Sequence, residues 1–308
     1  MTKTLTQPFK WIGSKVRMRP RVLEIIETIP RKLYVEPFGG SAAILLGKEP
    51  ENSVYNDLNG LLVNFFRVIR SPQDREKLRE IARYTPANYD FWHDFKNVCK
   101  AYLTHDENKL KAALEVANLT DYPVEIAVAF ALFYCQSLAF GGSVLHSYGE
   151  HCKPRGGNDH ASRVSLFDDY ADRLVYTVIT NRDFRDCFAK HDDPQTLFYC
   201  DPPYECESSN DYKTGWKTTD TTDLVDLLCR IQGSAVLSCY DADVYKPLLD
   251  AGYEKKDYAV NSSVRRGIYD NDTARVETIY WRRSDANREK IATLAARKDV
   301  ATGQRTLF

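Results

Sequence analysis

The chain has 308 residues, of which 43% are hydrophobic and 28% are charged, and its net charge is −1. This length allows one large α/β domain with a smaller inserted or appended one, while the near-neutral charge excludes a global basic field that would attract nucleic acid. No apolar run approaches the ~18 residues of a membrane span. The 8 cysteines include no C-x-x-C pair, and with no signal peptide they predict reduced thiols in a cytoplasmic protein without a metal site.

Residues 8–15 (Pro-Phe-Lys-Trp-Ile-Gly-Ser-Lys) gather aromatic rings and lysines around a glycine. Behind them, apolar residues recur at positions 22, 23, 26 and 29, which predicts an amphipathic helix. Taken alone, the segment is typical of an N-terminal stretch that docks its aromatic rings on the core.

The first α/β unit is predicted directly after this helix. Residues 32–36 read as a short strand, and residues 37–46 follow as a loop with Gly39 and Gly40 that leads into a helix. Strand, glycine loop and helix form the first unit of a doubly wound sheet. The glycines let the backbone approach a ligand closely at the helix N-terminus.

A second short strand, residues 53–56, ends at Asp57. A carboxylate at this position can accept hydrogen bonds from ribose hydroxyls. Asp57 can also cap the helix predicted over residues 58–69, whose apolar residues recur at helical spacing. The two roles are compatible.

The alternation of strands and helices stops between residues 71 and 162, which read as helices, including an apolar one over 123–138, and a loop rich in glycine and basic residues. We interpret 71–162 as an inserted helical domain. Residues 1–70 and 163–283 then form one discontinuous α/β domain, and 284–308 form a C-terminal helix and tail. Further strands are expected at 174–180 (before Asp183 and Phe184), 196–200 and 235–238, with an antiparallel pair at 253–264 and 276–281.

Asp201, Pro202, Pro203 and Tyr204 follow the buried strand 196–200. The prolines fix the backbone and have no amide hydrogen. The carbonyls at this strand end are therefore held in place and remain able to accept hydrogen bonds. The amino group of a nucleobase is a poor nucleophile, and two acceptors, the Asp201 carboxylate and the Pro202 carbonyl, would make its lone pair available for attack on a methyl group. Tyr204 offers a face for base stacking. The four residues alone fit a strand-end turn with a packed tyrosine equally well.

The order of these parts resembles that of the Dam-like (D12 class, alpha group) adenine-specific DNA methyltransferases, over about residues 8–283. The resemblance implies a Rossmann-like sheet that binds S-adenosylmethionine, an antiparallel C-terminal hairpin and an inserted helical target-recognition domain. It implies cofactor contacts for Trp11, Lys15, Asp57 and Asp201, a glycine loop at Phe38 and Gly40, and an Asp-Phe pair beside the cofactor adenine at Asp183 and Phe184.

This sequence departs from the family at two places. Ala42 stands where a glycine is common in the first loop, which predicts slightly different packing. Residues 135–142 (Cys-Gln-Ser-Leu-Ala-Phe-Gly-Gly) replace the Arg-Lys-Gly-Glu-Phe-Asn-like run of the members that recognise GATC. The GATC specificity therefore does not carry over, and the target sequence stays open.

The predicted reaction transfers a methyl group to the N6 of an adenine that is flipped out of double-stranded DNA, by direct in-line attack and without a metal. Four alternatives remain at this point. They are N4 methylation of cytosine in DNA, N6 methylation of adenine in RNA, methylation of a protein glutamine, for which asparagine is usual at position 201, and a DNA-binding module of the same fold without catalysis. The retention of Trp11, Lys15, Asp57 and Asp201 argues against the last.

Other segments give predictions about partners. The polar segment 205–219 predicts a lid over the flipped base. The final residues, from Gln304 to Phe308 (Gln-Arg-Thr-Leu-Phe), are similar to the peptide by which bacterial proteins dock on the replication sliding clamp, although a frayed end explains them as well. Candidates for DNA contacts, each equally explained as solvated surface, are Phe140, Lys153, Arg155, Arg163, Arg265 and Arg266.

Overall fold

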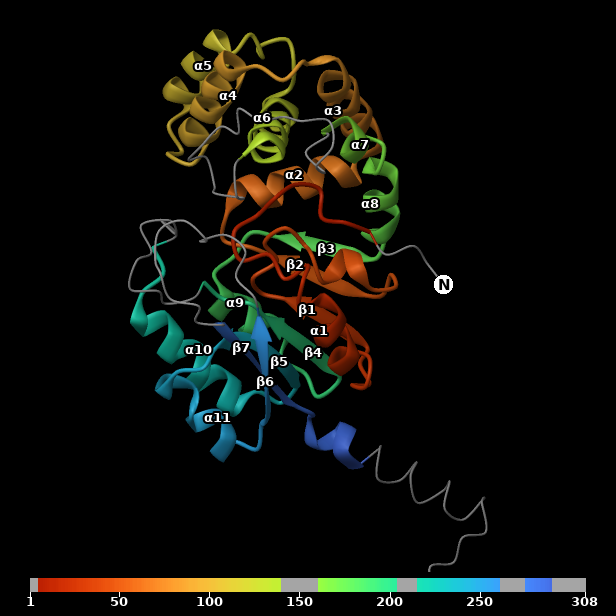
Figure 1. Ribbon diagram of the computed structural model, residues 1–308, viewed down its shortest axis with the longest axis vertical. Helices are drawn as coiled ribbons and strands as arrows, with labels where there is room; N and C mark the ends of the chain where they lie inside the picture. The colour runs from red at the N-terminus through yellow and green to blue at the C-terminus, as the bar shows by residue number, and fades with distance from the viewer. Residues whose placement is uncertain (1–4, 140–159, 204–214, 261–274, 290–308) are drawn as a thin grey trace, which may run out of the picture.

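A twisted sheet forms the centre of the molecule, and helices cover both of its faces (Figure 1). The structure is a computed structural model, and it describes residues 5–139, 160–203, 215–260 and 275–289. Within these residues the sheet has seven strands in the order β3-β2-β1-β4-β5-β7-β6. This order confirms the predicted doubly wound sheet with an antiparallel C-terminal pair.

The first five strands in the chain run parallel, and β7 runs antiparallel to β5 and β6. In the register, Tyr34 of β1 lies opposite Ser53 of β2 and Leu197 of β4. The carboxyl ends of β1, β2 and β4 therefore meet at one edge, where ligands bind in open α/β sheets. The strands are β1 (Leu33–Glu36), β2 (Ser53–Asn56), β3 (Thr177–Thr180), β4 (Thr196–Cys200), β5 (Ser234–Tyr240), β6 (Glu254–Val260) and β7 (Arg275–Arg282).

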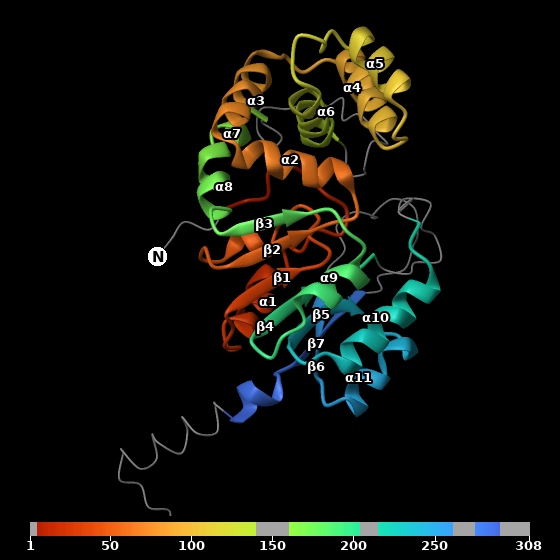
Figure 2. The same ribbon diagram turned by 180° about the vertical axis from the view of Figure 1, so that it is seen from behind.

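Successive strand residues enter two different hydrophobic cores because their side chains alternate between the faces of the sheet. Tyr34 belongs to one core and Val35 to the other. Helices α1 (Arg19–Ile26) and α2 (Gly60–Arg70) contribute to the first core. The second core is completed by α9 (Phe184–His191), α10 (Thr218–Arg230) and α11 (Pro247–Asp250). In Figure 1 and Figure 2, α9 lies beside the strands, and α10 and α11 lie towards one end of the molecule.

Between β2 and β3 the described chain is helical. Helices α3 to α6 gather at the end of the molecule away from α10 and α11, as Figure 2 shows from behind. Phe95 of α4 packs edge-on against Phe130 of α6, with ring centroids 5.0 Å apart, and Phe133 of α6 stacks on Phe65 of α2. This stretch therefore shares its core with α2. The helices are α3 (Pro72–Tyr84), α4 (Tyr89–Tyr102), α5 (Glu107–Val116), α6 (Val124–Leu138), α7 (His160–Val164) and α8 (Phe167–Arg173).

The N-terminal segment docks Phe9 on the core, as predicted for its aromatic rings, whereas Trp11 lines a cavity. Phe9 is fully buried, and its ring centroid lies 5.0 Å from that of Phe65. Lys10 donates a hydrogen bond to the carbonyl of Ala139, at the end of α6. The segment thus connects α2 to the end of α6.

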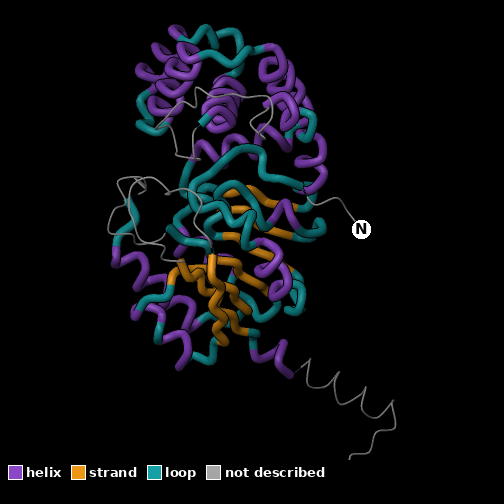
Figure 3. Tube along the Cα trace, in the orientation of Figure 1, coloured by secondary structure: helices purple, strands orange, loops and turns teal. Residues whose placement is uncertain are grey.

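Figure 3 shows strands in the middle of the molecule, with helices towards both ends and loops between them.

Two elements differ from the predictions around the glycine loop. The helix predicted after Gly40 is only a short 3₁₀ turn, η1 (Leu45–Gly47), because Gly40 and Ala42 both adopt left-handed backbone angles, with φ of 51° and 56°. Ala42 therefore occupies a conformation that favours glycine, so its departure from the family affects the backbone and not only packing. Helix α2 is capped by Asn59, which accepts from the Leu61 amide, and not by Asp57.

Strand β3 begins later than predicted, at Thr177 and not at residue 174. The preceding residues form α8, and the amide of Leu174 still donates to the carbonyl of Tyr170 at 3.1 Å. The helix therefore extends into the apolar run that the sequence assigns to the strand.

Some findings concern only the part of the chain that the structure describes. There, no helix is both long and apolar enough to cross a membrane, and no cluster of three or more His, Cys, Asp or Glu side chains is arranged to hold a metal ion. The described cysteines are free thiols.

Candidate active site

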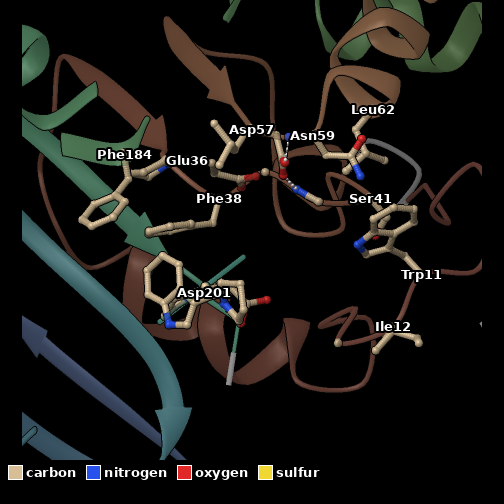
Figure 4. A pocket seen from close by; sticks show the side chains of 18 of the residues that line it. Trp11, Ile12, Glu36, Phe38, Ser41, Asp57, Asn59, Leu62, Phe184 and Asp201 are labelled. Carbon is tan, nitrogen blue, oxygen red and sulfur yellow. Dashed lines mark hydrogen bonds between the residues drawn. The ribbon is translucent and has the colours of Figure 1, made fainter. Parts of the chain in front are cut away.

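A cavity of about 640 Å³ opens at the carboxyl ends of β1, β2 and β4 (Figure 4). This volume lies within the range of sites for cofactor-sized ligands. The cavity brings together all the described residues that the sequence predicts for the reaction and the cofactor. They are Trp11, Lys15, Phe38, Gly40, Asp57, Asp183, Phe184, Asp201 and Pro202. Tyr204 and most of the segment predicted as a lid lie outside the described residues.

Asp201 is paired with a lysine from the N-terminal segment. All five residues of β4 are buried, so the strand end that carries Asp201 is rigid. The Lys15 ammonium lies 2.9 Å from an Asp201 carboxylate oxygen, with side-chain exposures of 4% and 19%. It also donates to the carbonyl of Gly13 at 2.8 Å. Among the described residues, no group donates to the Pro202 carbonyl.

Asp57 holds the glycine loop. Its two carboxylate oxygens accept from the amides of Gly40 and Asn59, each at 2.8 Å. Burial raises the pKa of Asp57 to about 6, although these amide donors favour its charged form. On the other side of the loop, the Tyr55 hydroxyl donates to the Gly40 carbonyl at 2.7 Å. The loop is thus fixed from both sides, and Asp57 keeps lone pairs for a diol.

Glu36 is a site residue that the sequence reasoning missed. It ends β1, is 2% exposed and lines the cavity. Burial raises its pKa to about 8; the hydrogen bond from Tyr34 (2.7 Å) and the charge of Lys48 oppose this shift, while the charge of Asp201 adds to it. The sequence did contain a signal for Glu36: an acidic residue ends the first predicted strand, as Asp57 follows the second.

Aromatic rings form one end of the cavity. Phe38 and Phe184 lie side by side there, and Trp11 lies at the opposite end (Figure 4). Asp183 caps α9, since its carboxylate accepts from the Arg185 amide at 2.8 Å. Trp216, which the sequence reasoning placed in a lid, lines the same end of the cavity.

Two lysines of α4, Lys96 and Lys100, also line the cavity and were not predicted. The two lysines are four residues apart, so both lie on one face of the helix. This spacing was the sequence signal that could have indicated a shared site. Arg163, a predicted DNA contact, does not line the cavity, and its guanidinium donates to the Gln7 carbonyl at 3.0 Å. The other predicted DNA contacts lie outside the described residues: Phe140, Lys153, Arg155, Arg265 and Arg266.

The cavity offers an apolar aromatic end, a carboxylate suited to a diol, and the Lys15–Asp201 pair. This set suits an elongated ligand with a nucleoside at one end and charged groups at the other. The Pro202 carbonyl, to which no described residue donates, and the Asp201 carboxylate add two acceptors beside it. With the sheet order, these features define an α/β protein with a ligand site at the carboxyl ends of its parallel strands, and the lining of that site suits a nucleoside.

The chain belongs to the D12 class N6 adenine-specific DNA methyltransferase family, whose match covers residues 11–260. It is 24% identical over 306 residues to the DNA adenine methylase of Haemophilus influenzae, a match that covers 95% of each chain. It is 23% identical over 217 residues to the DNA adenine methylase of Escherichia coli K12, over 69% of this chain and 70% of the relative. The protein is therefore an adenine-specific DNA methyltransferase, which selects adenine in DNA among the alternatives that the motif leaves open.

Proposed function

We propose that the methyl donor is S-adenosylmethionine and that this cavity holds it. The fit rests on the observation that one cavity joins an aromatic wall, a loop-bound carboxylate and a lysine–carboxylate pair. Phe38 and Phe184 would contact the adenine, and Asp183 its edge. Asp57 would accept hydrogen bonds from the ribose hydroxyls, and the backbone at Gly40 would approach the part of the cofactor beyond the ribose. Trp11 and Lys15 would contact the methionine end.

Asp201 and Pro202 would activate the target amine. The Asp201 carboxylate and the Pro202 carbonyl would each accept a hydrogen bond from one N–H of the adenine N6 amino group, which makes the nitrogen lone pair available for attack. S-adenosylmethionine supplies an electrophilic methyl group on its sulfonium when bound. As the nitrogen becomes positive, these fixed acceptors stabilise the charge without reorganising. Lys15 orients Asp201 through their 2.9 Å contact, and Tyr204 would stack on the base.

A duplex substrate requires that the adenine leave its stack, because N6 is otherwise paired. We propose that the helical stretch 71–162 is the target-recognition domain of a discontinuous enzyme and faces the DNA around the cavity mouth. The observation in favour is that α4 of this stretch contributes Lys96 and Lys100 to the cavity wall. The predicted contacts at Phe140, Lys153, Arg155, Arg265 and Arg266, and the clamp peptide from Gln304 to Phe308, stay predictions, as they lie outside the described residues.

Lys96 and Lys100 suit DNA phosphates better than a structural role. Burial and the neighbouring Lys100 charge lower the pKa of Lys96, and its ammonium lies 4.7 Å from the centroid of the Trp92 ring. Within the described residues, neither ammonium has a carboxylate partner within ion-pair distance. Two neighbouring cations without a carboxylate gain most from an anionic ligand, and phosphates dominate DNA affinity.

Nucleoside mass spectrometry tests the proposed mechanism. Unmethylated DNA is incubated with S-adenosylmethionine and the full chain, then digested. We expect N6-methyladenine from the wild type and none from Asp201→Ala, which should still bind DNA. Asp226→Ala is the matched control, because Asp226 is exposed on α10 and does not line the cavity. Appreciable N6-methyladenine from Asp201→Ala would contradict the role of this carboxylate.

A further inference from the structure

Trp216 completes an aromatic wall with two rings that the sequence predicts for the cofactor. The ring centroids of Phe38 and Phe184 lie 5.3 Å apart, and that of Trp216 lies 5.5 Å and 5.4 Å from them. Trp216 is half-buried and lines the cavity. The three rings thus pack into one apolar cluster, in which Trp216 lies edge-on to Phe38 at 81° and is tilted by 45° to Phe184. Such a cluster offers apolar contacts to a flat heteroaromatic ring.

The indole of Trp216 is held in place by the start of α10. Its Nε1–H donates to the Thr221 hydroxyl at 3.0 Å, and Thr221 is 2% exposed. The helix start is itself fixed, because the Lys217 amide donates to the Asp220 carboxylate at 2.8 Å. A ring fixed in advance loses little conformational entropy when a ligand stacks on it.

Arg185 ties this helix start to the other wall of the cavity. Its guanidinium lies 2.5 Å from Asp220 and 2.6 Å from Asp223, both of α10, and 3.2 Å from Asp183, which caps α9. It also covers the Phe184 ring, with Cζ 4.3 Å from the centroid. Burial raises the pKa of Asp220, but the hydrogen bond from Arg185 outweighs it and the net shift is downward. Asp183 and Asp220 both line the cavity, so one guanidinium spans the two walls.

We propose that Trp216 is the outer wall of the subsite for the cofactor's adenine ring, and that Arg185 is a positioning residue that holds this wall against Asp183 and Phe184. The inference rests on the proposed function, since it assigns one end of the S-adenosylmethionine site. Arg185 acts through its partners: the fork of its guanidinium reaches three carboxylates at once, which a lysine cannot do.

Calorimetric titration of the full chain with S-adenosylhomocysteine tests the role of Trp216. Loss of a stacking ring weakens binding of a base by about 5- to 150-fold, and we expect this range for Trp216→Ala. Trp216→Phe should bind nearly as the wild type does, because it keeps an aromatic face. Tyr84→Ala is the matched control, since Tyr84 is 75% exposed and does not line the cavity. Wild-type affinity in Trp216→Ala overturns the proposal.

Tryptophan emission gives a second readout that does not depend on Trp216→Ala folding. Trp11 and Trp216 both line the cavity, so binding of S-adenosylhomocysteine should change the emission of each. Adenosine, which lacks the methionine end, should change emission in Trp11→Phe and leave that of Trp216→Phe unchanged. An adenosine response that is kept in Trp216→Phe and lost in Trp11→Phe places the adenine at the opposite end and overturns the proposal.

Variants of Arg185 test the positioning role. Arg185→Ala should weaken S-adenosylhomocysteine binding by a smaller factor than Trp216→Ala, and Arg185→Lys should restore only part of the loss. Lys246→Ala removes an exposed ion pair with Asp243 outside the cavity and is the matched control. Equal affinity in Arg185→Ala and the wild type overturns the positioning role. If the wild type itself binds neither S-adenosylmethionine nor S-adenosylhomocysteine, the proposed function fails instead.

Discussion

The Lys15 ammonium lies 2.9 Å from the Asp201 carboxylate, although 186 positions separate the two residues in the chain. Lys15 is 4% exposed and comes from the N-terminal segment, whereas Asp201 ends β4. The pair thus couples the docking of that segment to the strand end that carries the Asp-Pro-Pro sequence. A lysine beside the proposed acceptor holds the carboxylate in place at the edge of the cavity.

Removal of the Lys15 charge should weaken methylation. In Lys15→Met the Asp201 carboxylate loses the ammonium that lies 2.9 Å from it, so it is no longer held in the position that the proposed mechanism needs. We expect kcat/KM to fall by about 10- to 100-fold, since a small misplacement of a reacting group costs this much. Steady-state kinetics on unmethylated duplex DNA measure the loss. Lys32→Met is the control, because Lys32 is exposed and does not line the cavity; equal kcat/KM in Lys15→Met and the wild type would contradict the coupling.

Glu36 should make the protein less stable as the pH rises. Burial raises its pKa in the folded state to about 8 from an ordinary value of 4.5. Between these values the folded chain holds a proton that the unfolded chain has lost, so this group lowers the free energy of unfolding by up to about 1.4 kcal/mol per pH unit. Glu36→Gln cannot titrate, and its stability should fall less between pH 5 and pH 8.

Urea unfolding at several pH values measures this difference. Glu24→Gln is the control, since Glu24 is exposed on α1, and it should keep the wild-type dependence. The comparison uses the slope with pH and not the absolute stability, because glutamine also changes the hydrogen bonding around Tyr34. Parallel curves for Glu36→Gln and the wild type would show that Glu36 titrates normally.

Cofactor binding should weaken in acid because of Asp57. Its pKa of about 6 means that it is largely charged at pH 7.5 and largely protonated at pH 5. A protonated oxygen cannot accept both the loop amide and a ribose hydroxyl, so we expect about tenfold weaker binding of S-adenosylhomocysteine at pH 5. Calorimetric titration at several pH values from 5 to 8 measures this change in affinity. Asp57→Ala should bind weakly with little pH dependence, and a constant wild-type affinity would refute the role.

Much of the sheet could be predicted from the sequence. Strands β2 and β4 begin and end at the predicted residues because each is short, has β-branched or aromatic residues at its centre and is followed by an aspartate. The prediction of a helix directly after Gly40 was wrong, because no local pattern in the sequence indicates that Ala42 adopts a left-handed φ. The start of β3 was wrong because the apolar residues of a helix end and of a strand follow each other without a break.

Residues that line the cavity could be predicted where motifs stand at strand ends, as with Asp57 and Asp201. Glu36 was missed because its burial depends on how β1 packs between β2 and β4. Trp216 was missed as a wall residue because its place depends on contacts with Thr221 and Phe184. Contacts between distant segments leave no periodic signal in the sequence, so the packed structure is needed to find them.

Gly39→Ala should disturb the loop that carries Gly40. A Cβ at position 39 would lie 2.2 Å from the Tyr55 ring, which is fully buried and tied to the Gly40 carbonyl by its hydroxyl. We expect a loss of about 1–3 kcal/mol in the free energy of unfolding, with weaker binding of S-adenosylhomocysteine. Gly60→Ala is the control, since its Cβ would meet its nearest atom at 3.5 Å. An unchanged melting temperature for Gly39→Ala would contradict this packing.

Lys96 and Lys100 should contribute to the salt dependence of DNA binding. Each phosphate contact adds about 0.9 to the slope of log affinity against log salt, so the double alanine variant should bind DNA more weakly with a slope smaller by up to about 2. S-adenosylhomocysteine binding should not change, which separates a DNA contact from a contact with the cofactor carboxylate. Fluorescence anisotropy of labelled duplex DNA at several salt concentrations measures the slope.

The matched control for these lysines is the double alanine variant of Lys109 and Lys111, which lie on α5 and do not line the cavity. Lys109 already pairs with Asp106 at 3.2 Å, so its loss should leave the slope near that of the wild type. If both double variants lower the slope equally, the lysines of α4 act only through net charge. If the Lys96 and Lys100 variant keeps its DNA slope and loses affinity for S-adenosylhomocysteine, the two ammonium groups belong to the cofactor site, because only a contact with that ligand could then explain the loss.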